Sequence, residues 1–152
     1  MPTQLGPIQD LDRWKAEALE RIGDGIVLAA ISGGKDSTAM GLLLKEAEIP
    51  YRSIFLDTGW EHPKTYEYLD GYLPQFLGPI IKLQSEVGGL DELVRKRGYF
   101  PNFAARYCTG ELKLRPIKLY IREMEDEAIN TVGVRAEESA RRAGYPVWEY
   151  NK

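Results

Sequence analysis

Apolar residues along the chain follow two alternating patterns. In one they recur at helical spacing, and in the other they form a short continuous run. The first stripe predicts a helix from about residue 10 to residue 21, built on Leu11, Trp14, Ala18 and Ile22. The run at 26–31 is continuously apolar, short and bounded by glycine. This pattern is typical of a strand that is buried on both faces of a parallel sheet.

The same alternation continues to the end of the chain. Helices are predicted at 36–47, from Pro63 onward with a kink or end at Pro74, at about 90–94, and from Pro116 onward. Strands are predicted at 51–56, 79–83 and 129–134, and residues 98–110 are expected to be irregular. The order predicts an α/β fold, an open parallel sheet of about five strands with helices on both faces. We expect residues 1–152 to form a single domain, with 1–24 as an N-terminal helix and 135–152 as the start of a C-terminal region.

Composition narrows the classes of function. The formal net charge is −3, so overall charge indicates neither a nucleic-acid nor a membrane partner, and an anion site requires a local cluster of basic groups. Cys108 is the only cysteine, which excludes an intrachain disulfide and predicts no iron–sulfur cluster within one chain. A reducing, cytoplasmic setting is expected, and we find neither a signal peptide nor an apolar run of membrane-spanning length.

Three unusual segments each follow the carboxyl end of a predicted strand: 32–37, 57–59 and 135–142. In open α/β sheets, ligands bind in the crevice outside those strand ends. The pattern of elements therefore places the candidate site there.

The first segment, Ser32-Gly33-Gly34-Lys35-Asp36-Ser37, joins a buried strand to a helix. Two adjacent glycines can adopt positive φ and bring N–H groups close to a ligand, and the helix N-terminus favours an anion. Hydroxyl donors come from Ser32, Ser37 and Thr38, and Lys35 adds a mobile cation. Asp36 is a helix cap, a partner of Lys35 or a ligand to Mg²⁺. The loop is not a Walker loop, and the alternative is a plain turn with Asp36 as N-cap.

This segment resembles the signature of the PP-loop ATP pyrophosphatases, within the adenine nucleotide alpha hydrolase superfamily. Three later segments resemble motifs of the phosphoadenosine phosphosulfate (PAPS) reductase family. They are Asp57-Thr58-Gly59 with Pro63 and Thr65, Arg106-Tyr107-Cys108-Thr109 with Leu112, Lys113 and Pro116, and Gly133-Val134-Arg135 with Glu138, Ser139 and Arg142. The four motifs run in order from about residue 26 to residue 148, which is most of the chain.

The resemblance implies two overlapping sets of site residues. The nucleotide-binding set is Ser32, Gly33, Gly34, Lys35, Asp36, Ser37, Asp57, Thr58, Gly59, Arg135 and Arg142. The catalytic set is Lys35, Asp36, Arg106, Lys113 and Arg135, with Asp36 as the candidate magnesium ligand. Two non-functional alternatives stay open. Asp57 could form a hydrogen bond to its own backbone in a turn. The arginines, with Arg115 and Arg141, could be surface charges paired with Glu137 and Glu138.

Two further side chains have more than one reading. His62, the only histidine, precedes Pro63 at a helix entry, where a capping or exposed role is favoured over a catalytic base. Cys108 is either a reactive thiol in a basic neighbourhood or a structural one. In assimilatory APS reductases the corresponding region carries paired cysteines that hold an iron–sulfur cluster, whereas residue 107 is tyrosine here.

Three functions follow from the resemblance. The first is an enzyme that binds ATP with Mg²⁺ and activates a substrate with release of pyrophosphate. The second is the nucleotide-binding part of a thioredoxin-dependent PAPS or APS reductase that lacks the family's C-terminal cysteine, in a chain either truncated or naturally short. The third is a non-catalytic module that senses nucleotide or binds a partner. Candidate partners are thioredoxin, a sulfur-donor protein and, in a homodimer, a second copy of the chain.

Overall fold

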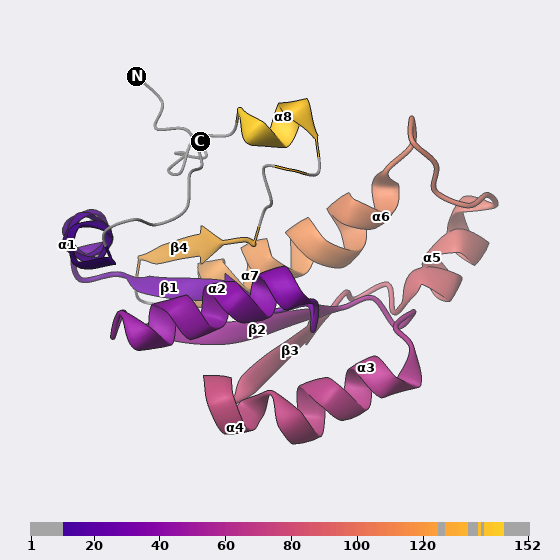
Figure 1. Cartoon of the computed structure of the whole chain (residues 1–152). Helices are drawn as coiled ribbons and strands as arrows, with labels where there is room; N and C mark the ends of the chain where they lie inside the picture. The colour runs from indigo at the N-terminus through magenta and orange to yellow at the C-terminus, as the bar shows by residue number, and fades with distance from the viewer. Residues whose placement is uncertain (1–10, 125–126, 134–136, 138, 145–152) are drawn as a thin grey trace.

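The computed structural model describes residues 11–124, 127–133, 137 and 139–144. In chain order the elements are α1 (Leu11–Ile22), β1 (Ile26–Ala30), α2 (Lys35–Glu46), β2 (Tyr51–Asp57), α3 (Pro63–Glu67), the π-helical turn η1 (Tyr68–Tyr72), α4 (Pro74–Leu77), β3 (Ile80–Gln84), α5 (Leu90–Arg97), α6 (Tyr107–Thr109), the π-helical turn η2 (Gly110–Leu114), α7 (Arg115–Glu123), β4 (Ala128–Thr131) and α8 (Ala140–Ala143). Figure 1 shows their arrangement.

The described strands form one parallel sheet in the order β3-β2-β1-β4. Val27 on β1 pairs with Tyr51 on β2 and with Ile129 on β4, so the central strand has partners on both sides. The α/β prediction is confirmed, although the described sheet has four strands rather than about five. All four carboxyl ends lie at one edge of the sheet, as the sequence predicted.

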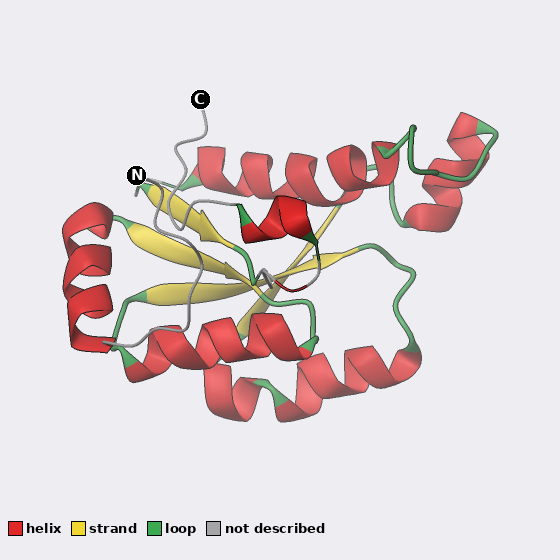
Figure 2. Cartoon of the chain, turned by 45° about the horizontal axis from the view of Figure 1, so that its top comes forward, coloured by secondary structure: helices red, strands yellow, loops and turns green. Residues whose placement is uncertain are grey.

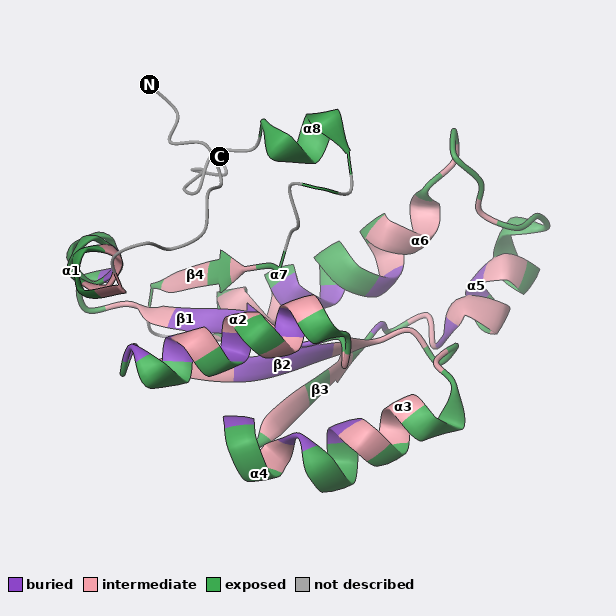
Figure 3. Ribbon diagram, in the orientation of Figure 1, coloured by how far each residue is buried: buried purple, intermediate pink, exposed green. Residues whose placement is uncertain are grey.

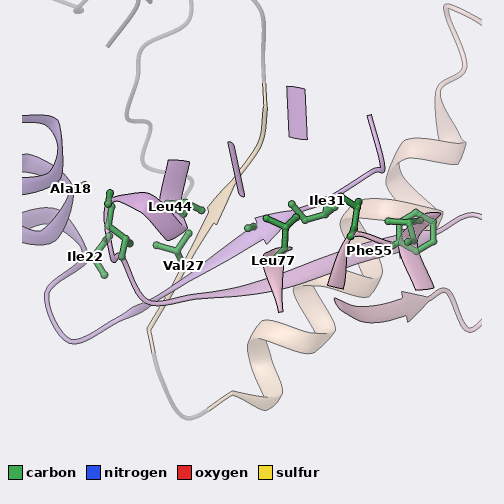
Figure 4. Close-up of a cluster of buried hydrophobic side chains, with 12 residues drawn as sticks. Ala18, Ile22, Val27, Ile31, Leu44, Phe55 and Leu77 are labelled. Carbon is green, nitrogen blue, oxygen red and sulfur yellow. The ribbon is translucent and has the colours of Figure 1, made fainter. Parts of the chain in front are cut away.

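Both faces of the sheet are covered by helices (Figure 2). On one face a buried cluster joins α1, α2, η1 and α4 to β1 and β2, and Figure 4 shows part of it. On the other face Ile117 of α7 packs against Leu28 and Ile54. Side chains that alternate along β1 serve opposite faces, which explains why the strand is apolar at every position.

Two proline positions differ from the prediction. Pro74 was expected to kink or end a helix, and instead the chain widens into η1 before it, where the Leu73 N–H donates to the Tyr68 carbonyl at 2.9 Å. The helix expected to start at Pro116 is α7, which starts one residue earlier at Arg115, and it continues from α6 through a π-helical turn, η2, before the proline. A proline ring clashes with the carbonyl four residues earlier, and a wider turn removes that conflict.

Other boundaries differ by a few residues. Strand β4 ends at Thr131, whereas the predicted strand ran to Val134, which lies outside the described residues. The segment 98–110 is irregular only as far as Arg106. Along the part of the chain that the structure describes, no helix is long and apolar enough to cross a membrane.

Candidate functional site

The candidate site lies where the chain changes direction across the sheet. From β1 the chain passes to β2 on one side, while β4 lies on the other side of β1. The strand order therefore reverses between β1 and β4, and α2 and α7 lie on opposite faces of the sheet, which is the position where open α/β sheets bind ligands. The loop after β1 contains Ser32 to Gly34 and leads directly into α2 (Figure 1).

Gly133 brings the loop after β4 onto the first turn of α2. A Cβ atom at this glycine would lie 2.8 Å from the Asp36 carbonyl carbon and oxygen and 3.0 Å from the Ser37 nitrogen. Only a residue without a side chain permits this approach. The loop after β4, where the fourth motif begins, therefore meets segment 32–37, whereas Arg135 lies outside the described residues.

The two glycines of the loop have different conformations. Gly33 has φ +80°, and a Cβ atom there would lie 3.4 Å from the Thr65 methyl group of α3. Gly34 has φ −81° and ψ 159°, an extended conformation that any residue adopts, and it is the N-cap of α2. The expectation that both glycines use positive φ is thus correct for Gly33 and wrong for Gly34.

Hydroxyl groups fix the shape of this turn from inside. Buried Ser37 donates its hydroxyl to the Gly34 carbonyl at 3.0 Å and accepts the Ser32 backbone N–H at 3.1 Å. The Ser32 and Ser37 hydroxyl oxygens are also 3.1 Å apart, and because Ser37 has already used its one proton, Ser32 is the donor. The Thr38 hydroxyl donates to the same Gly34 carbonyl at 3.0 Å. These contacts fix the backbone conformation of the turn that leads into Lys35 and Asp36.

The N-terminus of α2 carries no side-chain cap among the described residues. Asp36 lies within the first turn of this helix instead of at the cap position, so the plain turn with Asp36 as N-cap is not the structure observed. First-turn N–H groups have no partner within a helix, and their partial positive charge favours an anion. Gly34 and Lys35 are both exposed there, so a ligand can reach this end of the helix.

The neighbouring helix α5 provides a contrast. It also follows a strand and a glycine pair, Gly88-Gly89, but its first N–H groups are occupied. The Leu90 N–H donates to the Thr58 carbonyl at 2.8 Å, and the Gly89 N–H donates to the Glu92 carboxylate at 2.8 Å. The α5 end is therefore used to hold the loop after β2, and the α2 end is the one suited to an anion.

The turn at Asp57-Thr58-Gly59 is rigidly placed beside this edge. The Asp57 carboxylate accepts the Gly59 N–H at 2.8 Å and the Tyr66 hydroxyl at 2.7 Å. Gly59 has φ +67° and lies so close to Gly89 that an added Cβ atom would be 3.0 Å from the Gly89 Cα. Desolvation raises the pKa of Tyr66, and the hydrogen bond to Asp57 raises it further. The Gly88-Gly89 contact was not predicted, although a glycine pair between a strand and a helix repeats the pattern of residues 33–34.

Sequence comparison assigns this arrangement to a family. The model of the phosphoadenosine phosphosulfate reductase domain matches residues 26–152, which include all four motifs. The chain belongs to the phosphoadenosine phosphosulfate reductase domain family.

The family's relatives include proteins longer than this chain. An uncharacterized 37.8 kDa protein of Escherichia phage 186 is 32% identical over 82% of this chain and 52% of its own length. An uncharacterized protein of Methanocaldococcus jannaschii is 29% identical over 62% of this chain and 22% of its own length. The chain thus spans about half of the phage relative and less of the archaeal one.

The fold is shared with a solved member. The crystal structure of PAPS reductase from Candida auris, in a phosphate complex, matches with a TM-score of 0.54 at 13% sequence identity. The match covers 86% of this chain and 70% of that one. At this identity the likeness concerns the fold alone.

The basic residues of the PAPS reductase motifs lie in different surroundings. Arg106 and Lys113 are exposed and form no ion pair with any described residue, whereas Arg115 pairs with Glu86 at 3.0 Å and with Glu111 at 3.4 Å. Arg142 is exposed on α8. Arg115 is therefore a paired surface charge, although its partners are Glu86 and Glu111 and not the expected Glu137 and Glu138.

The two ambiguous side chains can also be placed. His62 is the N-cap of α3, where its Nδ1 accepts the Lys64 N–H at 3.1 Å, in line with the capping role. Cys108 is half-buried in α6. The described residues contain no group of three side chains suited to hold a metal ion, so Asp36 stays a single candidate ligand.

The two glycines can be separated by one substitution. We expect Gly33→Ser to lower the free energy of unfolding by about 1–2 kcal/mol, because a residue with a side chain is strained in the left-handed conformation that Gly33 adopts. Gly34→Ser should be neutral or slightly stabilising, since serine is a preferred N-cap. Urea unfolding of both variants checks this, and equal losses would contradict the assigned turn.

Tyr66→Phe removes the hydroxyl that donates to Asp57. We expect a loss of about 1.5–3 kcal/mol at neutral pH, the size of a hydrogen bond to a charged group. Because the folded pKa of Tyr66 is raised above 10.0, this contribution is intact below that pH and is lost as the pH rises through the folded pKa. The difference between wild type and variant should therefore shrink in alkali, with exposed Tyr72→Phe as a control that changes little. A pH-independent difference would show that the Asp57 contact is not its source.

Proposed function

We propose that this PAPS reductase family domain binds an adenine nucleotide with its phosphates on residues 32–37. The observation that carries the proposal is the uncapped N-terminus of the 12-residue helix α2, presented by the Gly33 turn at the carboxyl edge of the sheet. Loop amides, a helix dipole and a lysine in one place form a site for a polyanion. A nucleoside triphosphate offers such a site a chain of three negatively charged phosphates.

The proposed reaction is transfer of the adenylyl group of ATP to an acceptor. A nucleophilic oxygen or nitrogen of the acceptor forms a bond to the α-phosphorus. The bond from that phosphorus to the oxygen bridging to the β-phosphate breaks, and pyrophosphate leaves with the electron pair. Charge develops on the phosphate oxygens during this step, so positive groups that are already in position accelerate it.

The chain's own residues take distinct parts in this step. The amides of 33–37 and Lys35 bind the phosphates, with Ser32 and Ser37 holding the loop that presents them. Arg106, Lys113 and Arg135 neutralise developing charge. Asp57, Thr58, Gly59 and Arg142 hold the rest of the nucleotide.

Asp36 is the residue that would hold Mg²⁺. Magnesium in nucleotide sites commonly uses one or two carboxylates together with phosphate oxygens, and a single aspartate in the first turn of α2 fits that donor set. When bound, the ion supplies charge neutralisation at the phosphates. Because the substrate is ATP and the chain has one cysteine, we also propose a cytoplasmic location.

A second candidate function rests on the family match itself. The matching domain is that of PAPS reductase, so PAPS or APS could occupy the same loop, with thioredoxin as the reductant. Since the chain spans about half of the phage relative, the acceptor and protein partners of the whole protein stay open. Release of pyrophosphate from ATP supports the first function, release of sulfite from PAPS supports the second, and binding without turnover supports a sensing module.

Lys35→Ala tests the phosphate loop directly. We expect nucleotide affinity to fall about tenfold to a hundredfold, because a charge-assisted contact contributes about 1.5–3 kcal/mol and each 1.4 kcal/mol is one decade. Calorimetric titration of folded wild-type and variant protein with ATP, APS and PAPS measures this. Folding should be retained, since an exposed loop charge contributes little to the core.

Lys118→Ala is the matched control, since Lys118 is an exposed lysine on α7. Its affinity should equal that of the wild type. If Lys35→Ala and Lys118→Ala bind every nucleotide as the wild type does, the loop is only a turn and the proposal fails.

A further inference from the structure

The overall charge conceals a basic segment. Residues 95–115 contain six basic side chains and one acidic side chain, whereas the rest of the sequence contains 14 basic and 22 acidic ones. The whole chain is therefore acidic while one short segment is strongly basic. An arrangement of this kind attracts a polyanion locally even though the molecule carries a net negative charge.

The same segment carries exposed aromatic rings. Tyr99 is 48% exposed, Phe100 is 65% exposed and Phe103 is 97% exposed. They lie on the loop that joins α5 to α6, which projects beyond the carboxyl edge of the sheet (Figures 1 and 3). Phenylalanine is among the residues most often buried, so two such rings presented to water indicate a binding surface.

Hydrogen bonds hold this loop in one shape. The Asn102 side chain accepts the N–H groups of Ala104 at 3.0 Å and Ala105 at 2.8 Å, which closes a turn with Phe103 at its tip. The Tyr107 hydroxyl donates to the Tyr99 carbonyl, and their rings meet edge to face with centroids 5.3 Å apart. The exposed rings are thus presented by an ordered backbone, which lowers the entropy cost of binding.

Arg95 interacts electrostatically with Asp91, and the other five basic side chains divide into two groups. Arg97 lies over the Tyr107 ring and pairs with Glu111, and Arg115 pairs with Glu86 and Glu111, so these two stabilise the segment itself. Lys96, Arg106 and Lys113 are exposed and form no ion pair with any described residue, and of these Lys96 is the one not assigned to the nucleotide site. Positive charge therefore remains available beside the aromatic rings.

We propose that residues 95–107 form a surface that binds single-stranded nucleic acid. Proteins that bind single strands without sequence preference combine a basic surface that follows the phosphates with aromatic rings on which bases stack. Phe100 and Phe103 are two distinct exposed rings, so each can stack with a different base. A duplex has its bases stacked already, so it uses the charges and not the rings. An acidic protein would likewise use the charges, but it does not explain a ring exposed at the tip of an ordered turn.

A second exposed aromatic group on the molecule lacks this combination. Tyr68 stacks on Tyr72, and Tyr72 meets Phe76 at a tilt with centroids 5.0 Å apart. The nearby lysines are engaged, since Lys64 pairs with Glu67 and Lys45 donates to the Phe76 carbonyl at 2.5 Å. Phe76 is 41% exposed, so it serves as a matched control residue.

The test is fluorescence anisotropy of the 152-residue chain with a labelled single-stranded oligonucleotide of about 16 nucleotides, in the absence of ATP. We expect Phe103→Ala and Phe100→Ala each to weaken binding about fivefold to a hundredfold, the range measured for loss of one stacked base. Phe76→Ala should leave affinity unchanged. Lys96→Ala should lower the slope of log affinity against log salt by about 0.7, as one phosphate contact does.

Three results would overturn the proposal. The first is no binding of the single strand. The second is equal affinity for single strand and duplex that neither phenylalanine substitution changes, and the third is binding of thioredoxin in place of the oligonucleotide, with that binding lost in Phe103→Ala. Lys35→Ala separates this proposal from the nucleotide site. That variant should bind the oligonucleotide as the wild type does. Lys35→Ala therefore tests the nucleotide site, and the phenylalanine variants test the nucleic-acid surface.

Discussion

The left-handed turn at Gly33 is the constraint on which the candidate site depends. With φ +80°, it turns the chain from the buried strand β1 into α2 and leaves Gly34 as a cap that has no side chain to offer. The hydroxyls of Ser37 and Thr38 both donate to the Gly34 carbonyl, so the turn is stabilised from inside. The Gly34 N–H donates to the Ser32 hydroxyl at 3.4 Å, and the first-turn amides of α2 beyond it are the physical basis for an anion site.

Close backbone contacts then assemble the neighbouring loops around this turn. Gly133 brings the loop after β4 onto the first turn of α2, and Gly59 meets Gly89 between the loops after β2 and β3. Both contacts need glycine because a Cβ atom would approach within 3.0 Å of backbone atoms. Some residues of the PAPS reductase motifs therefore allow the loops to pack closely together. Others, such as Lys35, provide charge.

The parallel sheet and its carboxyl-edge crevice could be predicted because fully apolar strands such as β1 leave few alternatives. The helical segment before Pro116, from Tyr107 onward, could not be predicted. It depends on a wide turn that accommodates the proline, and the local spacing of apolar residues does not reveal such a turn. The extended conformation of Gly34 was missed because glycine permits either sign of φ, and the surrounding hydrogen bonds decide between them. Net charge describes the whole chain, so it does not reveal that six basic side chains gather in residues 95–115 while the remainder is acidic.

The central claim is that the backbone amides at the start of α2 hold nucleotide phosphates. The most direct measurement is a ¹⁵N–¹H correlation spectrum of the labelled protein during titration with ATP. The account predicts that the amide signals of residues 33–37 show the largest shifts and saturate together with nucleotide binding. Saturable ATP binding that leaves those five signals in place would contradict it.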